Sequence, residues 1–379
     1  MRKVFQLTKK QSYKISDSFI KFLIEISNGF INAALLEELF IAIEKEAENY
    51  HFTSSSEANL IRIISAVFNS KSFLRELIQY PHHLEIIIAI AGSSNYLTDI
   101  AVRNPEFLYQ LFNQYYLGKP ITEENLLKEI TNINIKFKTF KSNANILRSL
   151  KSKSILKIGV RDILGFSSLE ETVQQISTTA TTVLASLFDN SYKSVLLKNK
   201  VKTTSRKYCL ASLGKLGGRE LNYSSDVDLI LFFDKNSRIG KDKNIEYFEL
   251  LNEATRLFIK TASGLTANGF LYRIDFRLRP DGKNAPLCRT IADYERYYEM
   301  RGEDWERQML IKLDFLCGSK TLFELFQNYI VHYVYPASLS TSPVKQIKKM
   351  KANIEKNVFQ NLNITEPCRT RGGIMSISF

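Results

Sequence analysis

The chain has few of the residues that build zinc sites or disulfide frameworks. Its 379 residues include four cysteines and four histidines, and no two cysteines form a CxxC pair. Because the cysteines and histidines are scattered, the sequence argues against a zinc site. We expect the thiols to be reduced and partly buried.

Long apolar runs are also missing. The longest purely apolar run lies near Ile86–Ala91, far below the roughly 20 residues that cross a bilayer. The first ten residues are basic but lack the apolar core of a signal peptide. These absences argue against a membrane partner and predict a cytoplasmic protein.

No block of like charges stands out, although the chain is basic. It carries 52 Lys and Arg against 39 Asp and Glu, a formal net charge of +13. Such a balance suits nucleotides, acidic protein partners or nucleic acid. Because the lysines are spread along the chain, we interpret most of them as solvated surface and do not infer nucleic-acid binding from charge. The length allows two or three domains.

An informative pattern lies between Ala211 and Asp234. Asp226 and Asp228 stand one residue apart at the start of a hydrophobic segment, so on a β-strand both carboxylates point to one face. Two neighbouring like charges are unfavourable unless a cation lies between them. The pair predicts a divalent metal ion, Mg²⁺ or Mn²⁺, shared with substrate phosphates. A plain hairpin with two solvated acids is the alternative.

A glycine-rich loop precedes the two acids. Gly214, Gly217 and Gly218 surround Lys215, and glycines allow backbone N–H groups to approach phosphate oxygens closely. Lys215 adds a point charge. We expect this loop, with Ser225, to hold the phosphates of a nucleotide.

A second segment, Tyr272–Pro280, alternates strictly between apolar and charged residues. This period of two predicts a half-buried strand with Asp275 among arginines on its polar face. If it pairs beside the strand that carries the two acids, Asp275 becomes a third metal ligand, and Arg277 and Arg279 neutralise phosphate. Three carboxylates around metal ions would support in-line displacement at phosphorus. Ion pairs on a solvated sheet face are the alternative for the arginines.

The rest of the chain has mainly helical periodicity. An all-helical module is expected to about residue 140, and Ser168 with Glu171 predicts a capping box. We interpret Trp305 as packing and His82–His83 as a surface pair in a turn after a proline. Expected helices include those at 12–50, 245–262, 291–301 and 304–316.

Three blocks follow one another in a specific order: LGKLGGRELNYSSDVDLILFFD, YRIDFRLRPDGKNAPL and ERYYEMRGEDWERQMLIK. Together they resemble the glutamine synthetase adenylyltransferase family (glutamate–ammonia ligase adenylyltransferase, with its adenylyl-removing activity). A weaker similarity starts near Ser93, includes KIGVRDILGFSSLEE and extends to about residue 318. In the wider nucleotidyltransferase superfamily a hydrophobic residue, a glycine and a small residue precede the DxD. Leu213 and Gly214 match that pattern, and Lys215 departs from it.

The resemblance implies an α+β, mostly helical fold. It consists of a nucleotidyltransferase-type palm, with a small mixed β-sheet, flanked by helical modules. The expected domains are an N-terminal helical module at 1–140, a catalytic domain at 141–318 and the shortened start of a C-terminal helical region at 319–379. The implied catalytic and metal-binding residues are Asp226, Asp228 and Asp275. The expected nucleotide- and phosphate-binding residues are Gly214, Lys215, Gly217, Gly218, Ser225, Arg277 and Arg279.

The resemblance also implies a substrate and partners. Phosphate would attack the AMP–tyrosine phosphorus of adenylylated glutamine synthetase and release ADP, or ATP would donate AMP to the same tyrosine. The family's N-terminal half removes AMP, which favours the first direction. A PII signal protein is an implied regulatory partner, in the control of nitrogen assimilation.

The end of the chain departs from the family pattern. It reads RGGIMSISF, so Met375 stands in place of an arginine and Ser376 and Ser378 in place of two acids. The family's second catalytic half is absent, and we interpret the chain as an N-terminal portion. Two rival hypotheses follow: a non-catalytic fragment that binds glutamine synthetase or a PII signal protein, and a nucleotidyltransferase acting on nucleic acid.

Overall fold

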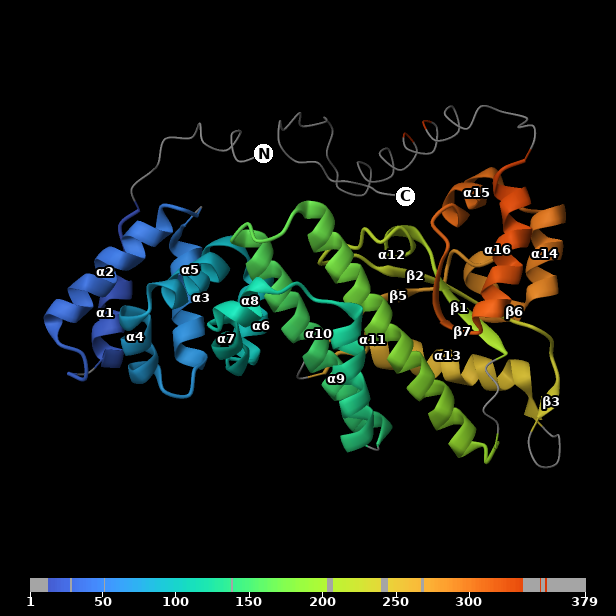
Figure 1. Cartoon of the computed structure of the whole chain (residues 1–379), viewed down its shortest axis with the longest axis horizontal. Helices are drawn as coiled ribbons and strands as arrows, with labels where there is room; N and C mark the ends of the chain where they lie inside the picture. Colours follow the sequence, from blue (N-terminus) through green and yellow to red (C-terminus); the bar gives the residue numbers. More distant parts are fainter. Residues whose placement is uncertain are drawn as a thin grey trace. The chain divides into compact units, whose positions relative to one another are not determined.

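The computed structural model describes residues 13–336, apart from 28, 51, 138, 203–206, 240–244 and 267–268, together with 348 and 352. Helices predominate and accompany one small mixed β-sheet (Figure 1), which confirms the predicted α+β, mostly helical class. The chain divides into two compact units, residues 1–126 with 148–179 and residues 127–147 with 180–379. The divergent end at Arg371–Phe379 lies outside the described residues.

The described part of the first unit is helical. Its apolar run Ile86–Ala91 is buried in α5, which contacts α2, α3, α4 and α6 and forms the centre of this core. None of the helices in the described part of the chain is both long and apolar enough to span a bilayer. The helices begin with α1 (Asp17–Ser27), α2 (Ala33–Ala47), α3 (Ser54–Ala66), α4 (Ser70–Gln79), α5 (Pro81–Ser93), α6 (Asn95–Arg103), α7 (Glu106–Leu111) and α8 (Gln114–Gly118).

The single helix expected at 12–50 is wrong. Helix α1 ends at Ser27, and Gly29 adopts a left-handed φ of +74°. Asn32 then caps α2, because its side chain accepts a hydrogen bond from Leu35 N at 2.8 Å. A left-handed glycine followed by an asparagine cap separates two helices whose apolar spacing looks continuous in the sequence.

The surface position expected for His83 is also wrong. Pro81 is the first residue of α5, so the histidine pair lies in a helix and not in a turn. His83 is 7% exposed, and its ring stacks on Phe112 with centroids 3.9 Å apart. Burial, with a smaller contribution from His82, lowers the pKa of His83 to about 4.

Three longer helices follow, and the division into units runs through them. They are α9 (Glu123–Lys136), α10 (Phe140–Ile163) and α11 (Leu169–Lys198). The predicted capping box at the start of α11 is confirmed. Ser168 N donates to the Glu171 carboxylate at 2.9 Å, and Glu171 N donates to Ser168 Oγ at 3.2 Å.

The second unit contains the sheet, with β2 at its centre. Strand β1 pairs antiparallel with one edge of β2, and β5 and then β6 run parallel along the other edge. Strand β7 extends the sheet beyond β1. These strands are β1 (Tyr208–Ser212), β2 (Val227–Phe233), β5 (Ile274–Asp275), β6 (Cys288–Thr290) and β7 (Asp314–Gly318), and a separate hairpin joins β3 (Arg238–Ile239) to β4 (Ile245–Glu246).

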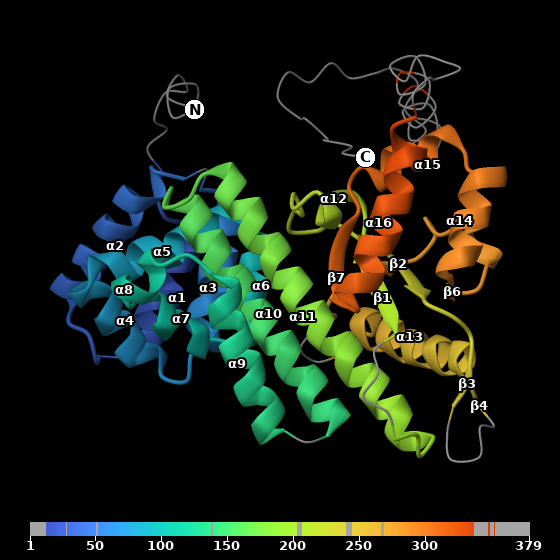
Figure 2. The ribbon, with the colours of Figure 1, turned by 45° about the vertical axis from the view of Figure 1, so that its right-hand side comes forward.

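Helices cover both faces of the sheet (Figure 1 and Figure 2). On one face Tyr208 and Phe233 meet aromatic residues of α11 and of α13 (Tyr247–Ser263). On the other, Phe232 packs on Phe326 with ring centroids 4.5 Å apart, in a core shared with α14 (Ile291–Met300), α15 (Asp304–Leu310) and α16 (Lys320–Val334). Because side chains alternate along a strand, Asp228 shares the second face with Phe232.

The helix expected at 304–316 is wrong in its second half. Helix α15 ends at Leu310, and Asp314–Gly318 form β7. Ser212 Oγ donates to Asp314 O at 3.3 Å, where β7 meets β1.

The strand expected at Tyr272–Pro280 is much shorter than predicted. It pairs with β2 at Ile274–Asp275, and then the chain turns, with Arg279 N donating to Phe276 O at 3.3 Å. The turn ends the alternation of the two faces, so Arg279 is buried instead of sharing the exposed face of Arg277.

Candidate active site

A cavity of about 770 Å³ lies at the amino-terminal end of β2. Its walls come from the short helix α12 (Gly214–Gly217), the loop that leads into β2, the segment around β5, and α15. The structure therefore brings together segments that are far apart in the sequence. The predicted site residues that line this cavity are Gly214, Lys215, Ser225, Asp226, Asp228, Asp275 and Arg277.

Asp228 and Asp275 lie directly opposite each other on two parallel strands. This register confirms that the two predicted segments are neighbours in the sheet. Burial, and then the carboxylates of Asp275 and Asp226, raise the pKa of Asp228 to about 6. Asp226 and Asp275 therefore lie close enough to Asp228 to disfavour its charged form.

Two arginines already engage the other two acids. Arg273 Nε pairs with Asp226, and its NH2 group donates to Ser224 O at 2.5 Å. Arg277 donates to the Asp275 carboxylate from both its backbone N and its Nε, each at 2.7 Å. Burial acts to raise the pKa of Asp275, but the hydrogen bonds from Arg277 outweigh it and the pKa is lowered.

Carboxylate oxygens are suitable ligands for a divalent cation, but the three acids do not form a preformed metal site. Within the described residues, no group of three or more Asp, Glu, His or Cys side chains is placed to hold a metal ion. Asp228, whose pKa is raised by burial and then by its acidic neighbours, has the charge environment that a cation would relieve. A cation shared with Asp226 or Asp275 would compete with Arg273 or Arg277 for the carboxylate oxygens.

Gly214 is placed directly against the Asp228 carboxylate. Its φ is +57°, in the left-handed region that favours glycine, and a Cβ there would lie 2.6 Å from Asp228 Oδ2. Leu213 N donates to Asp228 O at 2.9 Å, which ties the same loop to β2. The loop therefore lies close above the acid, with the half-buried Lys215 next along the chain.

Gly217 and Gly218 lie outside the lining of the cavity. A Cβ on Gly217 would lie 1.8 Å from the carbonyl oxygen of Lys312, and one on Gly218 would lie 3.1 Å from the Lys312 side chain. Close packing of α12 against the segment before β7 accounts for Gly217. The structure shows no contact between these two glycines and the space in which phosphate would lie.

Arg279 also lies outside this cavity and is 7% exposed. Its guanidinium donates hydrogen bonds to backbone carbonyl oxygens before and after it in the loop. The acceptors, at 2.6 to 3.2 Å, belong to Phe276, Lys283, Ala285 and Pro286. Arg279 thus holds a loop together and does not face the site that the alternation predicted.

Sequence reasoning missed part of the lining. Trp305, Gln308 and Met309 face the cavity from α15, and Trp305 is 38% exposed, although it was expected to pack. Their spacing of three and four residues places them on one helix face, a signal that could have identified them together. The other lining residues missed are Asn222, Ser224, Arg273 and Leu278.

Comparisons with known proteins identify the family of the chain. The model of the family described as glutamate-ammonia ligase adenylyltransferase matches residues 84–328, which include every lining residue of the cavity. The chain belongs to this family. Three similar relatives, from Shewanella woodyi, Psychromonas ingrahamii and Nitrosomonas europaea, carry the name bifunctional glutamine synthetase adenylyltransferase/adenylyl-removing enzyme.

The match to these family members is partial in length. Identity is 27% to the Shewanella and Psychromonas proteins and 28% to the Nitrosomonas protein, in each case over 78% of this chain. The alignments cover 31% to 32% of the relatives. The chain therefore spans about a third of the length of these family members.

Proposed function

We propose that the chain is a metal-dependent nucleotidyltransferase that acts on glutamine synthetase. It removes AMP from an adenylylated tyrosine with phosphate as the acceptor, or transfers AMP from ATP to that tyrosine. Membership of the family and the names of the relatives support the class of substrate. The proposed regulatory partner is a PII signal protein. The proposed role of the chain is the control of nitrogen assimilation.

The observation that carries this proposal is the pairing of Asp228 with Asp275 inside a cavity that also contains Lys215 and Arg277. Asp226, Asp228 and Asp275 would hold Mg²⁺ or Mn²⁺, which offsets charge on phosphate oxygens when bound. Lys215 would contribute a positive charge to the phosphates.

The cavity also contains groups that would orient the substrate. Arg273 and Arg277 are the other cations of the lining, and a guanidinium binds phosphate oxygens in a bidentate manner. Trp305, exposed on α15, offers a flat surface beside the reacting groups.

The two directions of the reaction are displacements at the same phosphorus. In removal, a phosphate oxygen forms the new bond and the bond to the tyrosine oxygen breaks, which leaves ADP and a tyrosine that takes up a proton. In transfer, the tyrosine oxygen attacks the α-phosphorus of ATP, loses its proton and displaces pyrophosphate. We propose the first direction for this chain, because its three blocks resemble the family's N-terminal half.

The test is ADP release from adenylylated glutamine synthetase with phosphate and Mg²⁺ or Mn²⁺. We expect Asp228→Asn to lower the rate by roughly a hundredfold or more, as expected when a metal ligand is removed. Asp234→Asn is the matched control, because Asp234 follows the other end of β2 and is exposed. Equal rates in the wild type and Asp228→Asn would refute the site.

One observation favours the non-catalytic alternative. Arginines neutralise Asp226 and Asp275, so these acids are paired within the protein itself. If the chain binds glutamine synthetase or a PII signal protein but produces neither ADP nor pyrophosphate with either metal, the binding fragment is the better account.

A further inference from the structure

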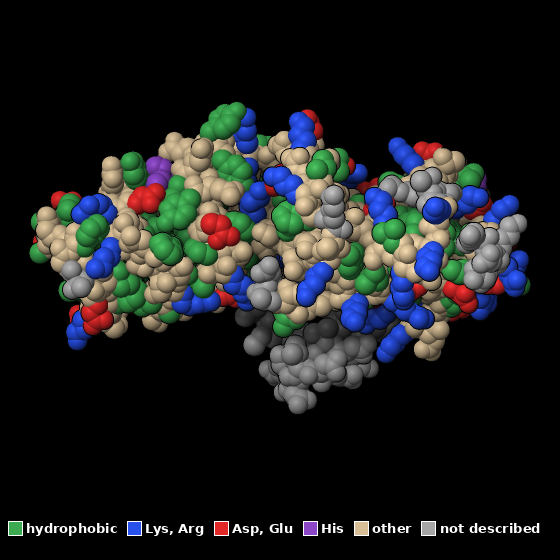
Figure 3. Space-filling view, turned by 90° about the horizontal axis from the view of Figure 1, so that it is seen from below, with side chains coloured by type: hydrophobic (Ala, Val, Ile, Leu, Met, Phe, Trp, Pro, Cys, Tyr) green, Lys and Arg blue, Asp and Glu red, His purple; other side chains and the backbone are tan. Residues whose placement is uncertain are grey.

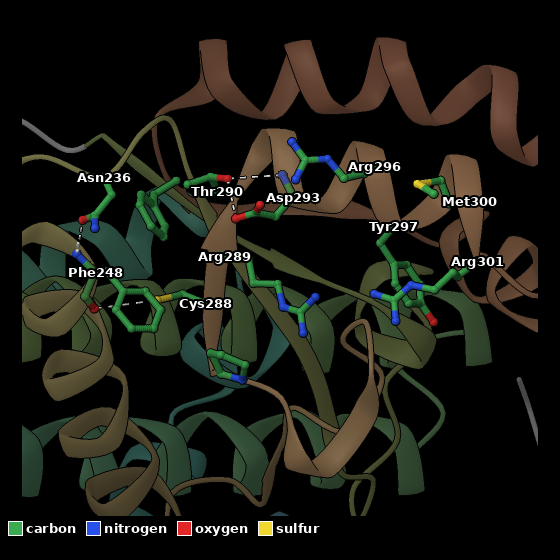
Figure 4. A pocket seen from close by; sticks show the side chains of 12 residues that line it. Asn236, Phe248, Cys288, Arg289, Thr290, Asp293, Arg296, Tyr297, Met300 and Arg301 are labelled. Atoms are coloured by element: carbon green, nitrogen blue, oxygen red, sulfur yellow. Dashed lines mark hydrogen bonds between the residues drawn. The ribbon is translucent and has the colours of Figure 1, made fainter.

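A second cavity, of about 430 Å³, lies at the opposite end of β2. Phe233, the last residue of β2, is in its wall, as are Arg289 and Thr290 at the end of the parallel strand β6. Helix α14, which starts directly after β6, closes another side (Figure 4). Ligands of open α/β sheets commonly bind outside the carboxyl ends of parallel strands, and the volume is within the range of small-molecule sites.

Arginines dominate the charge of this cavity. Figure 4 shows the guanidinium of Arg289 in the middle of the lining residues, with Arg301 on the side of Tyr297 and Arg296 near Thr290. Arg289 is partly enclosed, with 19% of its side chain exposed. Three guanidinium groups around one small cavity are the usual means of binding a carboxylate or phosphate.

One acid, Asp281, is shared by two of these arginines. Arg289 NH2 lies 2.6 Å from Asp281 Oδ2, and Arg301 NH1 lies 3.1 Å from Asp281 Oδ1. Arg279 lies close by, and its pKa is lowered, first by burial and then also by the charge of Arg289. Asp293 also lines the cavity, so its three arginines lie near two acids, Asp281 and Asp293.

The opposite wall is apolar and aromatic. Phe233 and Phe248 line it, with ring centroids 6.4 Å apart. Asn236 accepts a hydrogen bond from Phe248 N at 3.1 Å, which fixes this wall. The lining thus combines guanidinium groups with aromatic side chains.

We propose that this cavity binds a small organic anion. Its carboxylate or phosphate group pairs with Arg289 and Arg301, and its apolar or aromatic body lies against Phe233 and Phe248. The site is distinct from the cavity around Asp228, and the inference does not depend on the proposed reaction.

Asp281 would compete with such a ligand for Arg289 and Arg301. It occupies the guanidinium donors that the incoming anion would use. Removing its charge should therefore free both arginines and strengthen binding. Asp281 has a left-handed φ of +59°, which asparagine tolerates well, so Asp281→Asn removes the charge with little effect on the backbone.

The experiment is isothermal titration of the full chain with phenyl phosphate, with inorganic phosphate and phenol as probes for each half of the ligand. We expect phenyl phosphate to bind more tightly than either half. Arg289→Gln should weaken its binding by roughly tenfold, the loss expected for one charge-assisted hydrogen bond. Asp281→Asn should strengthen it several-fold. Arg256→Gln, at an exposed position of α13 outside the lining of both cavities, should leave it unchanged.

Several outcomes would overturn the proposal. The first is that phenyl phosphate does not bind at millimolar concentration. The second is that Arg289→Gln and Asp281→Asn weaken its binding equally. The third is that Lys215→Gln weakens its binding while Arg289→Gln has no effect, which would place the ligand in the active-site cavity. If Arg289→Gln fails to fold, Asp281→Asn decides alone. Tighter binding then supports the site, and unchanged or weaker binding overturns it.

Discussion

Gly214 and Asp228 show how single positions determine the active-site cavity. The backbone of Gly214 occupies the space next to the Asp228 carboxylate, in a conformation that residues with a Cβ adopt at a cost. The carboxylate and the loop above it therefore cannot be changed independently. A substitution at Gly214 acts on the acid as well as on the loop.

We predict that Gly214→Ala abolishes most AMP turnover. Its left-handed φ costs about 1–2 kcal/mol with a side chain, and the added Cβ would also displace Asp228 Oδ2. Gly29→Ala is the matched control, because Gly29 has a φ of +74° but its Cβ would meet no atom within 4 Å. Turnover in the two variants is the measurement. A fully active Gly214→Ala would contradict the close contact.

His83 predicts a dependence of stability on pH. Burial lowers its pKa in the folded state to about 4, from about 6.5 for an ordinary histidine. The unfolded chain therefore binds more protons between these values, and the free energy of unfolding should fall as the pH is lowered from about 6.5 to about 4. Denaturant unfolding at several pH values measures this. His83→Phe, which cannot titrate, should show a smaller decrease, and an equal slope in both proteins would refute the assignment.

At the scale of elements, the loop from Phe276 to Pro286 lies between the two cavities. Arg277, before it turns, faces the active-site cavity, and Asp281, after the turn, pairs with arginines of the second cavity. The buried guanidinium of Arg279 donates hydrogen bonds to backbone carbonyl oxygens of the loop and so stabilises its conformation. The loop is therefore fixed by hydrogen bonds to one side chain rather than by strand pairing.

We predict that Arg279→Met destabilises the second unit by about 2–4 kcal/mol, because several buried carbonyl groups lose their donor. Arg279→Lys should recover little of this, since a single ammonium does not reach all of the acceptors. Arg256→Gln is the control on an exposed helix position of α13, where an effect within about 0.5 kcal/mol is expected. Urea unfolding monitored by Trp305 fluorescence separates these variants.

Some parts of the site could be predicted from the sequence and others could not. The two acids before the hydrophobic segment of β2 and the alternation around Asp275 led to the hypothesis that these strands are neighbours, and the structure pairs them. Strand β7 was missed because Asp314–Gly318 follows α15 after a short connection and continues its apolar spacing. The position of Arg279 depended on the turn at Phe276, which three-dimensional packing determines and alternation does not reveal.

At the scale of the whole molecule, the excess of basic residues bears on which partners the chain attracts. On the face drawn in Figure 3, the described Lys and Arg side chains are spread among acidic and hydrophobic ones. Such a distribution favours solubility and weak, salt-sensitive attraction to polyanions. On this face, the described residues do not form the continuous basic groove that follows a nucleic-acid backbone.

We therefore predict weak RNA binding that is lost as salt rises. A fluorescent single-stranded RNA should show micromolar or weaker affinity at 50 mM salt and no measurable binding at about 200 mM, as expected for nonspecific contacts. Fluorescence anisotropy is the measurement. Tight, sequence-dependent binding at the higher salt would favour a nucleotidyltransferase that acts on nucleic acid.

Strand β2 is bonded along both edges, to β1 on one side and to β5 and β6 on the other. Amide protons in its middle are thus released to solvent only when a neighbouring strand separates. Hydrogen exchange at Ile230 and Leu231 would then report the separation of a neighbouring strand from β2. The rate of this exchange limits how long the Asp228 end and the Phe233 end of β2 stay parts of one intact sheet.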